Sequence, residues 1–206
     1  MKHRRLLVAG LLIIYGCGSS PAVSPSSASA AGVSPNASVG ASPNASVGSS
    51  PSSYASAIYG YSVTLPAGWQ TRPAKARWDG SGAPGHDDPT VDIVEPTTGV
   101  MSVFAFAAPI TLDLTGYARD VVARNVQFHG DTCPSPTPDK IEPANVAGEP
   151  ATFIAWNCGI LINIVVVIHA GIGYEFVMRD PDVHAATDPT DRKAFDDLLA
   201  SVKFPS

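Results

Sequence analysis

The sequence predicts an α+β domain in which an antiparallel sheet of about six strands, in the order βββ-α-βββ-α, is flanked by two helices as an α/β/α sandwich. Segments with alternating apolar and polar side chains lie on both sides of residues 114–128, where the apolar residues change to helical spacing. The run 160–168 is apolar on both faces, which is typical of an inner strand with a helix packed on each side.

The first half of this domain predicts three strands. Residues 59–66 alternate apolar and small polar side chains and end at a proline, and Trp69 just beyond them is expected to cap the core. A loop rich in Gly, Pro and Asp covers residues 79–89. It is followed by strands over 90–94 and 100–106.

A helix follows these strands over residues 114–128. Asp113 or Thr115 can cap its start, and Gly130 can end it in the left-handed conformation. The prolines at positions 134, 136, 138 and 143 predict that the next stretch has no regular structure.

The second half of the domain predicts a meander of three strands. These strands cover residues 151–156, 160–168 and 174–178. Turns at 157–159 and 170–173 contain the glycines that tight reversals favour. Consecutive strands joined by such short turns are expected to pair antiparallel.

A second helix ends the chain. Asp188 is placed to cap it, Pro189 stands at the first helical position, and Asp191 lies in the first turn. Four apolar side chains at i, i+3, i+4 and i+7 form its buried stripe: Phe195, Leu198, Leu199 and Val202.

Several of these elements resemble the PsbP-like superfamily. The resemblance is carried by Tyr-Gly-Tyr-Ser-Val-Thr-Leu-Pro-Ala-Gly-Trp at 59–69, Gly-Glu-Pro-Ala at 148–151 and Phe-Asp-Asp-Leu-Leu-Ala-Ser-Val-Lys-Phe at 195–204, and it spans nearly all of 58–206. Similar domains serve as extrinsic subunits of photosystem II and as secreted bacterial lipoproteins. The resemblance therefore implies a sandwich that binds other proteins, and it supplies no catalytic motif to carry over.

The N-terminus resembles a bacterial lipoprotein signal. Basic residues precede the apolar run 6–15, and Ile-Tyr-Gly-Cys at 14–17 resembles a lipobox. The run is shorter than the roughly 20 residues that a transmembrane helix needs. We expect residues 1–16 to be removed and Cys17 to carry a lipid such as palmitate, which would hold the protein on the extracytoplasmic face of the cell membrane. Because Tyr15 is bulky for a lipobox, an ordinary secretory signal is the alternative.

Residues 17–57 predict the lipidated cysteine followed by a disordered linker. From position 18 to position 57 the chain is almost entirely Ser, Ala, Pro, Gly and Val and has no charged residue. An eight-residue repeat, Ser-Pro-Asn-Ala-Ser-Val-Gly-Ala and then Ser-Pro-Asn-Ala-Ser-Val-Gly-Ser, is too small and polar to bury a core. The globular domain is then expected over 58–206.

The charge balance argues against some partners. Removal of the signal would take away three of the thirteen Lys and Arg residues and no acid, so ten basic side chains would stand against eighteen acidic ones, a net charge of −8. A nucleic acid partner is not expected, because binding it needs a clustered basic surface. Attachment to anionic lipid is equally disfavoured, so membrane contact would come from acyl chains.

Two cysteines are left once Cys17 is lipidated, an even number in an oxidising compartment. Cys133 follows the first helix and Cys158 lies in the first turn of the meander, so a disulfide between them would pin the proline-rich connection to the sheet. The alternative is a reactive thiol, which has no neighbouring Cys-x-x-Cys motif to favour it.

The sequence has no established catalytic or cofactor motif, so we expect a non-enzymatic domain without cofactor or metal. The candidate binding residues lie in two loops: Trp78, His86, Asp87 and Asp88 in one, and Asp180, Asp182 and His184 in the other. An exposed tryptophan among glycines and prolines would suit a contact hot spot. The first loop could present oxygen ligands for weak calcium binding, but calcium binding is not expected, because this loop lacks the one-three-five ladder of carboxylates.

These features predict a membrane-anchored, extracytoplasmic binding or accessory domain with a protein partner at the cell envelope. The alternative is an extracytoplasmic hydrolase whose active site is assembled from loops. The absence of a nucleophile-and-base signature in the sequence favours the binding domain.

Overall fold

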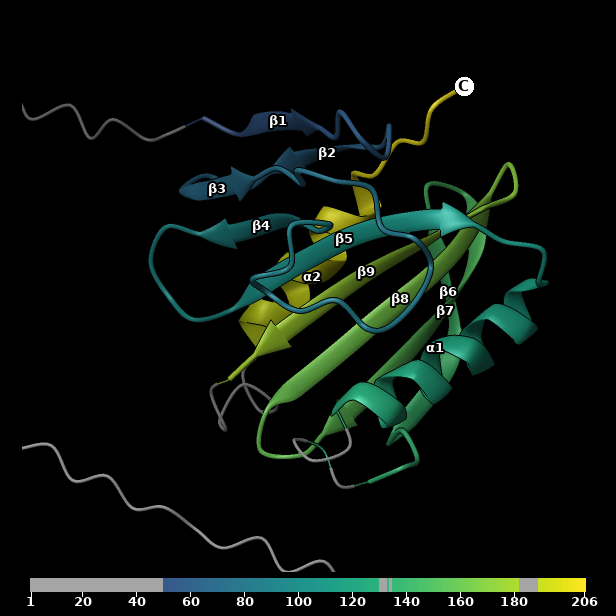
Figure 1. The fold of residues 1–206 in the computed structure, drawn as a ribbon. Helices are drawn as coiled ribbons and strands as arrows, with labels where there is room; N and C mark the ends of the chain where they lie inside the picture. The colour runs from purple at the N-terminus through teal and green to yellow at the C-terminus, as the bar shows by residue number, and fades with distance from the viewer. Residues whose placement is uncertain (1–49, 130–132, 134, 182–188) are drawn as a thin grey trace, which may run out of the picture. The chain divides into compact units, whose positions relative to one another are not determined.

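Nine strands and two helices make up the part of the chain that the structure describes, residues 50–129, 133, 135–181 and 189–206 of a computed structural model (Figure 1). The strands are β1 (Ser52–Ala55), β2 (Ser62–Leu65), β3 (Trp69–Arg72), β4 (Asp92–Pro96), β5 (Ser102–Pro109), β6 (Lys140–Val146), β7 (Glu149–Asn157), β8 (Leu161–His169) and β9 (Ile172–Asp180). The helices are α1 (Leu114–His129) and α2 (Pro189–Ala200).

Seven strands form one antiparallel sheet in the order β3-β4-β5-β9-β8-β7-β6, and β1 pairs with β2 in a separate ribbon. The predicted antiparallel α+β sandwich is confirmed, with the meander as β7, β8 and β9. Residues 162–167 of the inner strand β8 are buried without interruption, as its largely apolar sequence predicts.

Three strands were not predicted, and each has a physical reason. β1 lies inside the segment expected to be linker, so the regular structure begins before position 58. β3 starts at the half-buried Trp69, which was expected only to cap the core. β6 contains Pro143, and the expectation of irregular structure there was wrong. A proline is tolerated because β6 is an edge strand, where a missing N–H need not face a partner.

The two helices cover opposite faces of the sheet (Figure 1). On one face, α1 packs against β7 and β8. On the other, α2 lies beside the β1–β2 ribbon, and the ring of Tyr61 meets Phe176 of β9 edge-on at 5.6 Å. The loop between β3 and β4 crosses β5 and β9 on the α1 face, where it takes the place of a further helix.

The helix ends agree with the caps read from the sequence where they are described. Asp113 is the cap of α1, since its Oδ1 accepts a hydrogen bond from the Gly116 backbone N–H at 2.7 Å. α2 begins at Pro189, as predicted. Gly130 and Asp188, the other expected caps, lie outside the described residues.

Candidate functional site

Trp78 is buried, with 5% of its surface exposed. Its ring meets Phe106 edge-on at 4.8 Å, the Arg124 guanidinium lies 4.9 Å above the ring, and its Nε1–H donates to the Ser81 carbonyl at 2.6 Å. The expectation of an exposed contact residue was wrong. Because α1 leaves part of its sheet face uncovered, the β3–β4 loop supplies the missing apolar cover, and Trp78 is the largest side chain available for it.

Two carboxylates of this loop are used within the loop. Asp79 accepts hydrogen bonds from the Ser81 N–H and hydroxyl, and Asp88 accepts from the N–H and hydroxyl of Thr90. These contacts are local turns of the kind that Asp favours. Asp87 points to solvent, with 97% of its side chain exposed. Among the described residues, no group of three or more His, Cys, Asp or Glu could hold a metal ion.

His86 lies at the far end of the loop in a polar cluster on the surface. Its ring nitrogens lie 3.2 Å from the Arg72 guanidinium, 3.2 Å from Asp87 and 3.3 Å from Glu95. The Arg72 side chain also donates to the His86 carbonyl at 2.6 Å. This arrangement ties the loop end to β3 and β4, so His86 has a positioning role whether or not it binds a ligand.

The structure brings one residue from each predicted loop to the same pocket. His86 and Asp180 both line a pocket of about 220 Å³ at the end of β9. Asp180 is 99% buried and is the last residue of β9, so it does not lie in a loop as the sequence led us to expect. Asp182 and His184 lie outside the described residues.

A buried charge network on the α1 face was not among the predicted candidates. Arg124 of α1 donates to Glu175 of β9 at 2.6 Å, to Asp120 at 2.8 Å and to the Gly82 carbonyl at 2.8 Å. The Tyr117 hydroxyl donates to the same Glu175 oxygen at 3.0 Å. The sequence carried a signal for this network, because an arginine stands within the first helix and a glutamate within an otherwise apolar strand.

Burial raises the pKa of the Glu175 carboxyl above its ordinary value, and the Arg124 charge opposes that shift. Burial also raises the pKa of the Tyr117 hydroxyl, and the Glu175 charge beside it adds to the effect. The cavity that adjoins Glu175 has a volume of about 10 Å³, which is room for one water molecule. The network therefore fastens the loop at Gly82 to α1 and β9, in a place without room for a substrate.

A larger groove runs between α1 and the β6–β7 hairpin. Its volume is about 590 Å³, and its lining is mostly apolar. The α1 wall includes Leu114, Ala118 and Val122 at i, i+4 and i+8, and the β6 wall includes Ile141, of which 58% is exposed. Sequence reasoning missed this groove because β6 was expected to have no regular structure.

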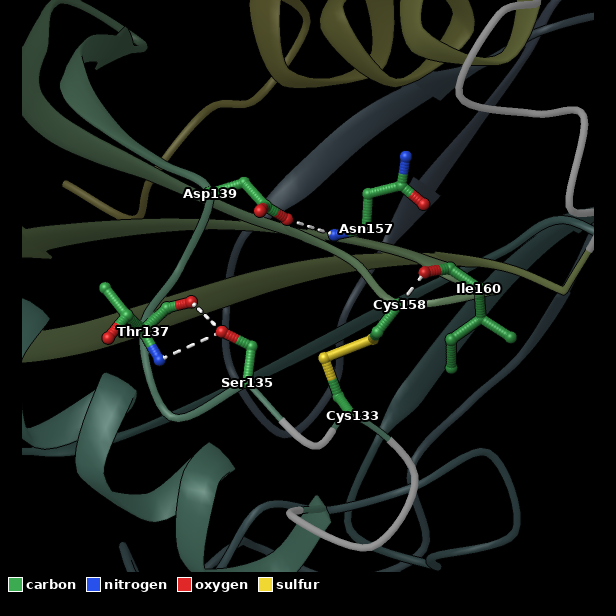
Figure 2. Close-up of a disulfide and its surroundings, with 7 residues drawn as sticks. All are labelled: Cys133, Ser135, Thr137, Asp139, Asn157, Cys158 and Ile160. Carbon is green, nitrogen blue, oxygen red and sulfur yellow. Dashed lines mark hydrogen bonds between the residues drawn. A yellow bond between two sulfur atoms is a disulfide. The ribbon is translucent and has the colours of Figure 1, made fainter.

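A disulfide joins Cys133, which follows α1, to Cys158 in the turn between β7 and β8 (Figure 2). The two Cα atoms lie 5.2 Å apart. Nearby, the Asp139 carboxylate accepts a hydrogen bond from the Asn157 backbone N–H at 2.5 Å. These links attach the connection after α1 to the turn of the hairpin, the place expected from the sequence.

The expected lipid attachment residue, Cys17, lies outside the described residues. Within residues 50–206, apart from the segments that are not described, neither helix is long and apolar enough to cross a membrane.

Among solved structures, the chain is similar to cyanobacterial PsbP (CyanoP) from Synechocystis sp. PCC 6803, with a TM-score of 0.54 and 16% sequence identity. The matched region covers 81% of this chain and 99% of that one. No model of a protein family matches the chain, and no curated protein matches it. At this level of identity the likeness concerns architecture alone, and it establishes that the chain has a PsbP-like fold.

Proposed function

We propose that the protein is a lipid-anchored accessory domain on the extracytoplasmic face of the membrane, and that it binds an amphipathic helix of a partner protein in the groove between α1 and the β6–β7 hairpin. The observation that carries the proposal is the groove itself, with a volume of about 590 Å³ and an apolar lining. Exposed apolar surface of this kind on a small domain is typical of an interaction site.

A helical occupant fits the groove better than an added strand does. Pro143 removes one N–H from the β6 edge, which weakens the edge as a template for strand pairing. Along α1, the side chains of Leu114, Ala118 and Val122 form a continuous row, and the short Ala118 leaves depth for a partner's side chain.

The charge at the rim of the groove indicates the chemistry of the partner. Arg119 of α1 is exposed and makes no ion pair within the described part of the chain, whereas Glu142 on the opposite wall is paired with Lys140 at 2.8 Å. A free guanidinium at the rim attracts an acidic side chain and fixes the orientation of the bound helix. The expected partner segment is therefore apolar on one face with Asp or Glu beside it.

The N-terminal sequence supports the location. A lipid on Cys17 and a flexible segment of Ser, Ala, Pro and Gly would hold the domain within a reach on the order of 30 Å from the membrane. The Cys17→Ser variant should appear in the medium or as an unprocessed precursor. Retention of this variant in washed membranes at the wild-type level would contradict the lipid anchor and would leave the groove proposal intact.

Site-specific crosslinking in intact membranes tests the groove. A photo-reactive amino acid at Ile141 should capture a partner, whereas the same group at Phe128, which is 54% exposed and lies outside the groove, should not. Ile141→Asp places a charge in the apolar groove and should abolish crosslinking from a second groove position, Val122.

The matched control for Ile141→Asp is Phe128→Asp, which adds the same charge at a similarly exposed position. Both variants should keep the wild-type melting temperature within a few degrees, because exposed positions contribute little to stability. Equal capture by Ile141→Asp and the wild type would reject the groove as the binding site.

A further inference from the structure

Arg179 is a half-buried arginine that the network on the α1 face does not use. It lies on the same face of β9 as Glu175, and it lines both the water-sized cavity beside Glu175 and the 220 Å³ pocket. Within the described residues, the Arg179 side chain makes no hydrogen bond and no ion pair. Burial lowers the pKa of Arg179. The pKa of Arg124, in contrast, is raised despite burial, because Arg124 has the carboxylates of Glu175 and Asp120 as partners. A half-buried guanidinium without an acceptor is costly and favours an anion beside it.

Ser102 supplies a second donor at the same place. It lies directly opposite Arg179 in the register between β5 and β9, so the two Cβ atoms are neighbours on one face of the sheet. The residue is 93% buried, and its hydroxyl has no hydrogen-bond partner in the described part of the chain. Both donors line the pocket, and together they could hold two oxygens of one ligand.

The rest of the pocket is mainly apolar. Val100, Phe104 and Ile160 form walls, and His86 lies at the margin with its ring 5.9 Å from that of Phe104. Asp180 follows Arg179 at the end of β9, and adjacent residues of a strand point to opposite faces of the sheet. The pocket thus combines a planar cationic donor and a hydroxyl with walls that suit a short hydrocarbon or aromatic body.

We propose that this pocket binds a carboxylate, with the Arg179 guanidinium and the Ser102 hydroxyl as donors and the apolar walls around a short apolar body. The planar fork of arginine matches the two oxygens of a carboxylate. The carboxylate could belong to a free organic acid or to the C-terminus of a peptide. This site is separate from the groove of the proposed function and shares no lining residue with it.

Nitrogen-15 NMR of the domain tests the proposal with benzoate as the probe and benzamide as its neutral counterpart. Benzoate should shift the Arg179 side-chain Nε–H and the Ser102 amide in a saturable way, and benzamide should not. Equal shifts with both compounds would overturn the proposal. Inorganic phosphate is the third probe, and phosphate binding as tight as that of benzoate would overturn the choice of a carboxylate.

Variants separate a binding role from a structural one. Arg179→Met and Arg179→Lys should each weaken benzoate binding by about tenfold or more, because both lose the bidentate fork. Ser102→Ala should weaken it less. The matched control is Arg77→Met, which removes an exposed arginine outside the pocket and should leave benzoate binding unchanged.

Stability gives an independent readout. Since Arg179 has no partner within the described residues, Arg179→Met should leave the melting temperature unchanged or raise it. A large fall, or benzoate binding by Arg179→Met at the wild-type level, would overturn the proposal. Benzoate and a short peptide with a free or an amidated C-terminus then distinguish the two sources: binding of the free-terminus peptide alone identifies a protein terminus, and binding of benzoate alone identifies a small acid.

Discussion

The two faces of the seven-stranded sheet each bury a carboxylate, and they compensate its charge in different ways. On the α1 face, Glu175 is 99% buried and is paired with the Arg124 guanidinium at 2.6 Å. On the face of the β1–β2 ribbon, Asp92 is equally buried, but its Oδ1 accepts from neutral donors, the Tyr54 hydroxyl at 2.7 Å and the Ala74 N–H at 2.8 Å. One face thus relies on an ion pair, and the other on neutral hydrogen bonds.

The difference teaches where each face is vulnerable. A buried ion pair contributes little net stability, yet the loss of one partner leaves an uncompensated charge in the interior. A carboxylate held by neutral donors loses only part of its compensation when one donor is removed. Because Arg124 also holds the Gly82 carbonyl and covers the Trp78 ring, damage on the α1 face should extend to the β3–β4 loop.

The largest expected effect is that of Arg124→Met. Removal of the guanidinium leaves Glu175 buried without its cation and should lower the free energy of unfolding by about 3–5 kcal/mol. Chemical denaturation of the mature domain measures it. The control is Lys193→Met, which removes an exposed i,i+4 pair with Asp197 and should cost less than about 1 kcal/mol. Similar losses in the two variants would refute the distinction between a buried and a surface pair.

The loss of stability caused by Arg124→Met should also depend on pH. The pKa of Glu175 is raised in the folded protein, so its stabilising contribution is fully present below the unfolded value near 4.5 and is lost as the pH rises through the folded value. Without Arg124 that pKa rises further, because the opposing charge is gone. The variant should therefore lose less stability at about pH 5 than at about pH 8. A loss of stability that is constant over this pH range would show that Glu175 stays ionised in the Arg124→Met variant.

The disulfide holds the connection that follows α1. Replacing both Cys133 and Cys158 with Ala should lower the free energy of unfolding by about 3 kcal/mol, given their sequence separation of 25. Chemical denaturation should give the same free energy of unfolding for the variant and for the reduced wild type. Intact mass of the exported protein should rise by about 2 Da on reduction, and labelling of both thiols before reduction would contradict the bond.

Close packing between α1 and β9 should make Gly173→Ala destabilising by about 1–3 kcal/mol. A Cβ atom there would lie 2.7 Å from two ring atoms of Tyr117 and 2.9 Å from Cδ1 of Ile110. Since Tyr117 bonds Glu175, the clash strains the network of the α1 face. Gly85→Ala is the control, because its added Cβ would meet no atom within 4 Å. Equal melting temperatures for the two variants would show that Tyr117 moves aside easily.

The smallest expected effect lies on the opposite face. Tyr54→Phe removes one of the two donors to Asp92 Oδ1 and should cost about 1 kcal/mol, because the Ala74 N–H is retained. Thermal unfolding of Tyr54→Phe and of Arg124→Met under the same conditions compares the two losses of stability directly. A loss as large as that of Arg124→Met would mean that neutral donors are as indispensable to a buried carboxylate as a cation is.

Local chemistry explains why much of the fold could be predicted. The inner strand β8 follows from a largely apolar run, the start of α1 from Asp113, and the hairpin turns from glycines such as Gly159 and Gly171, both at positive φ. The pairing of Cys133 with Cys158 followed from their number and their places at the ends of elements. In each case the residues that specify the feature lie within the element or at its ends.

The binding surfaces could not be predicted in this way. Trp78 has the sequence surroundings of an exposed loop residue, and only the part of the sheet that α1 leaves uncovered makes it a core residue. Pro143 disfavours a strand except at a sheet edge, and whether β6 is an edge depends on the order of all seven strands. The groove between α1 and β6 was missed for the same reason.

The sequence by itself determined both helices and six of the nine described strands in their order, the cap of α1, the turns of the meander, and which strand is buried on both faces, because hydrophobic periodicity and backbone preference act over a few residues. Only the tertiary structure decided that Arg124 pairs with Glu175, 51 residues away, and that Arg179 has no such partner among the described residues. Those outcomes depend on strand register and on which elements share a face of the sheet, and both are set by contacts between distant parts of the chain.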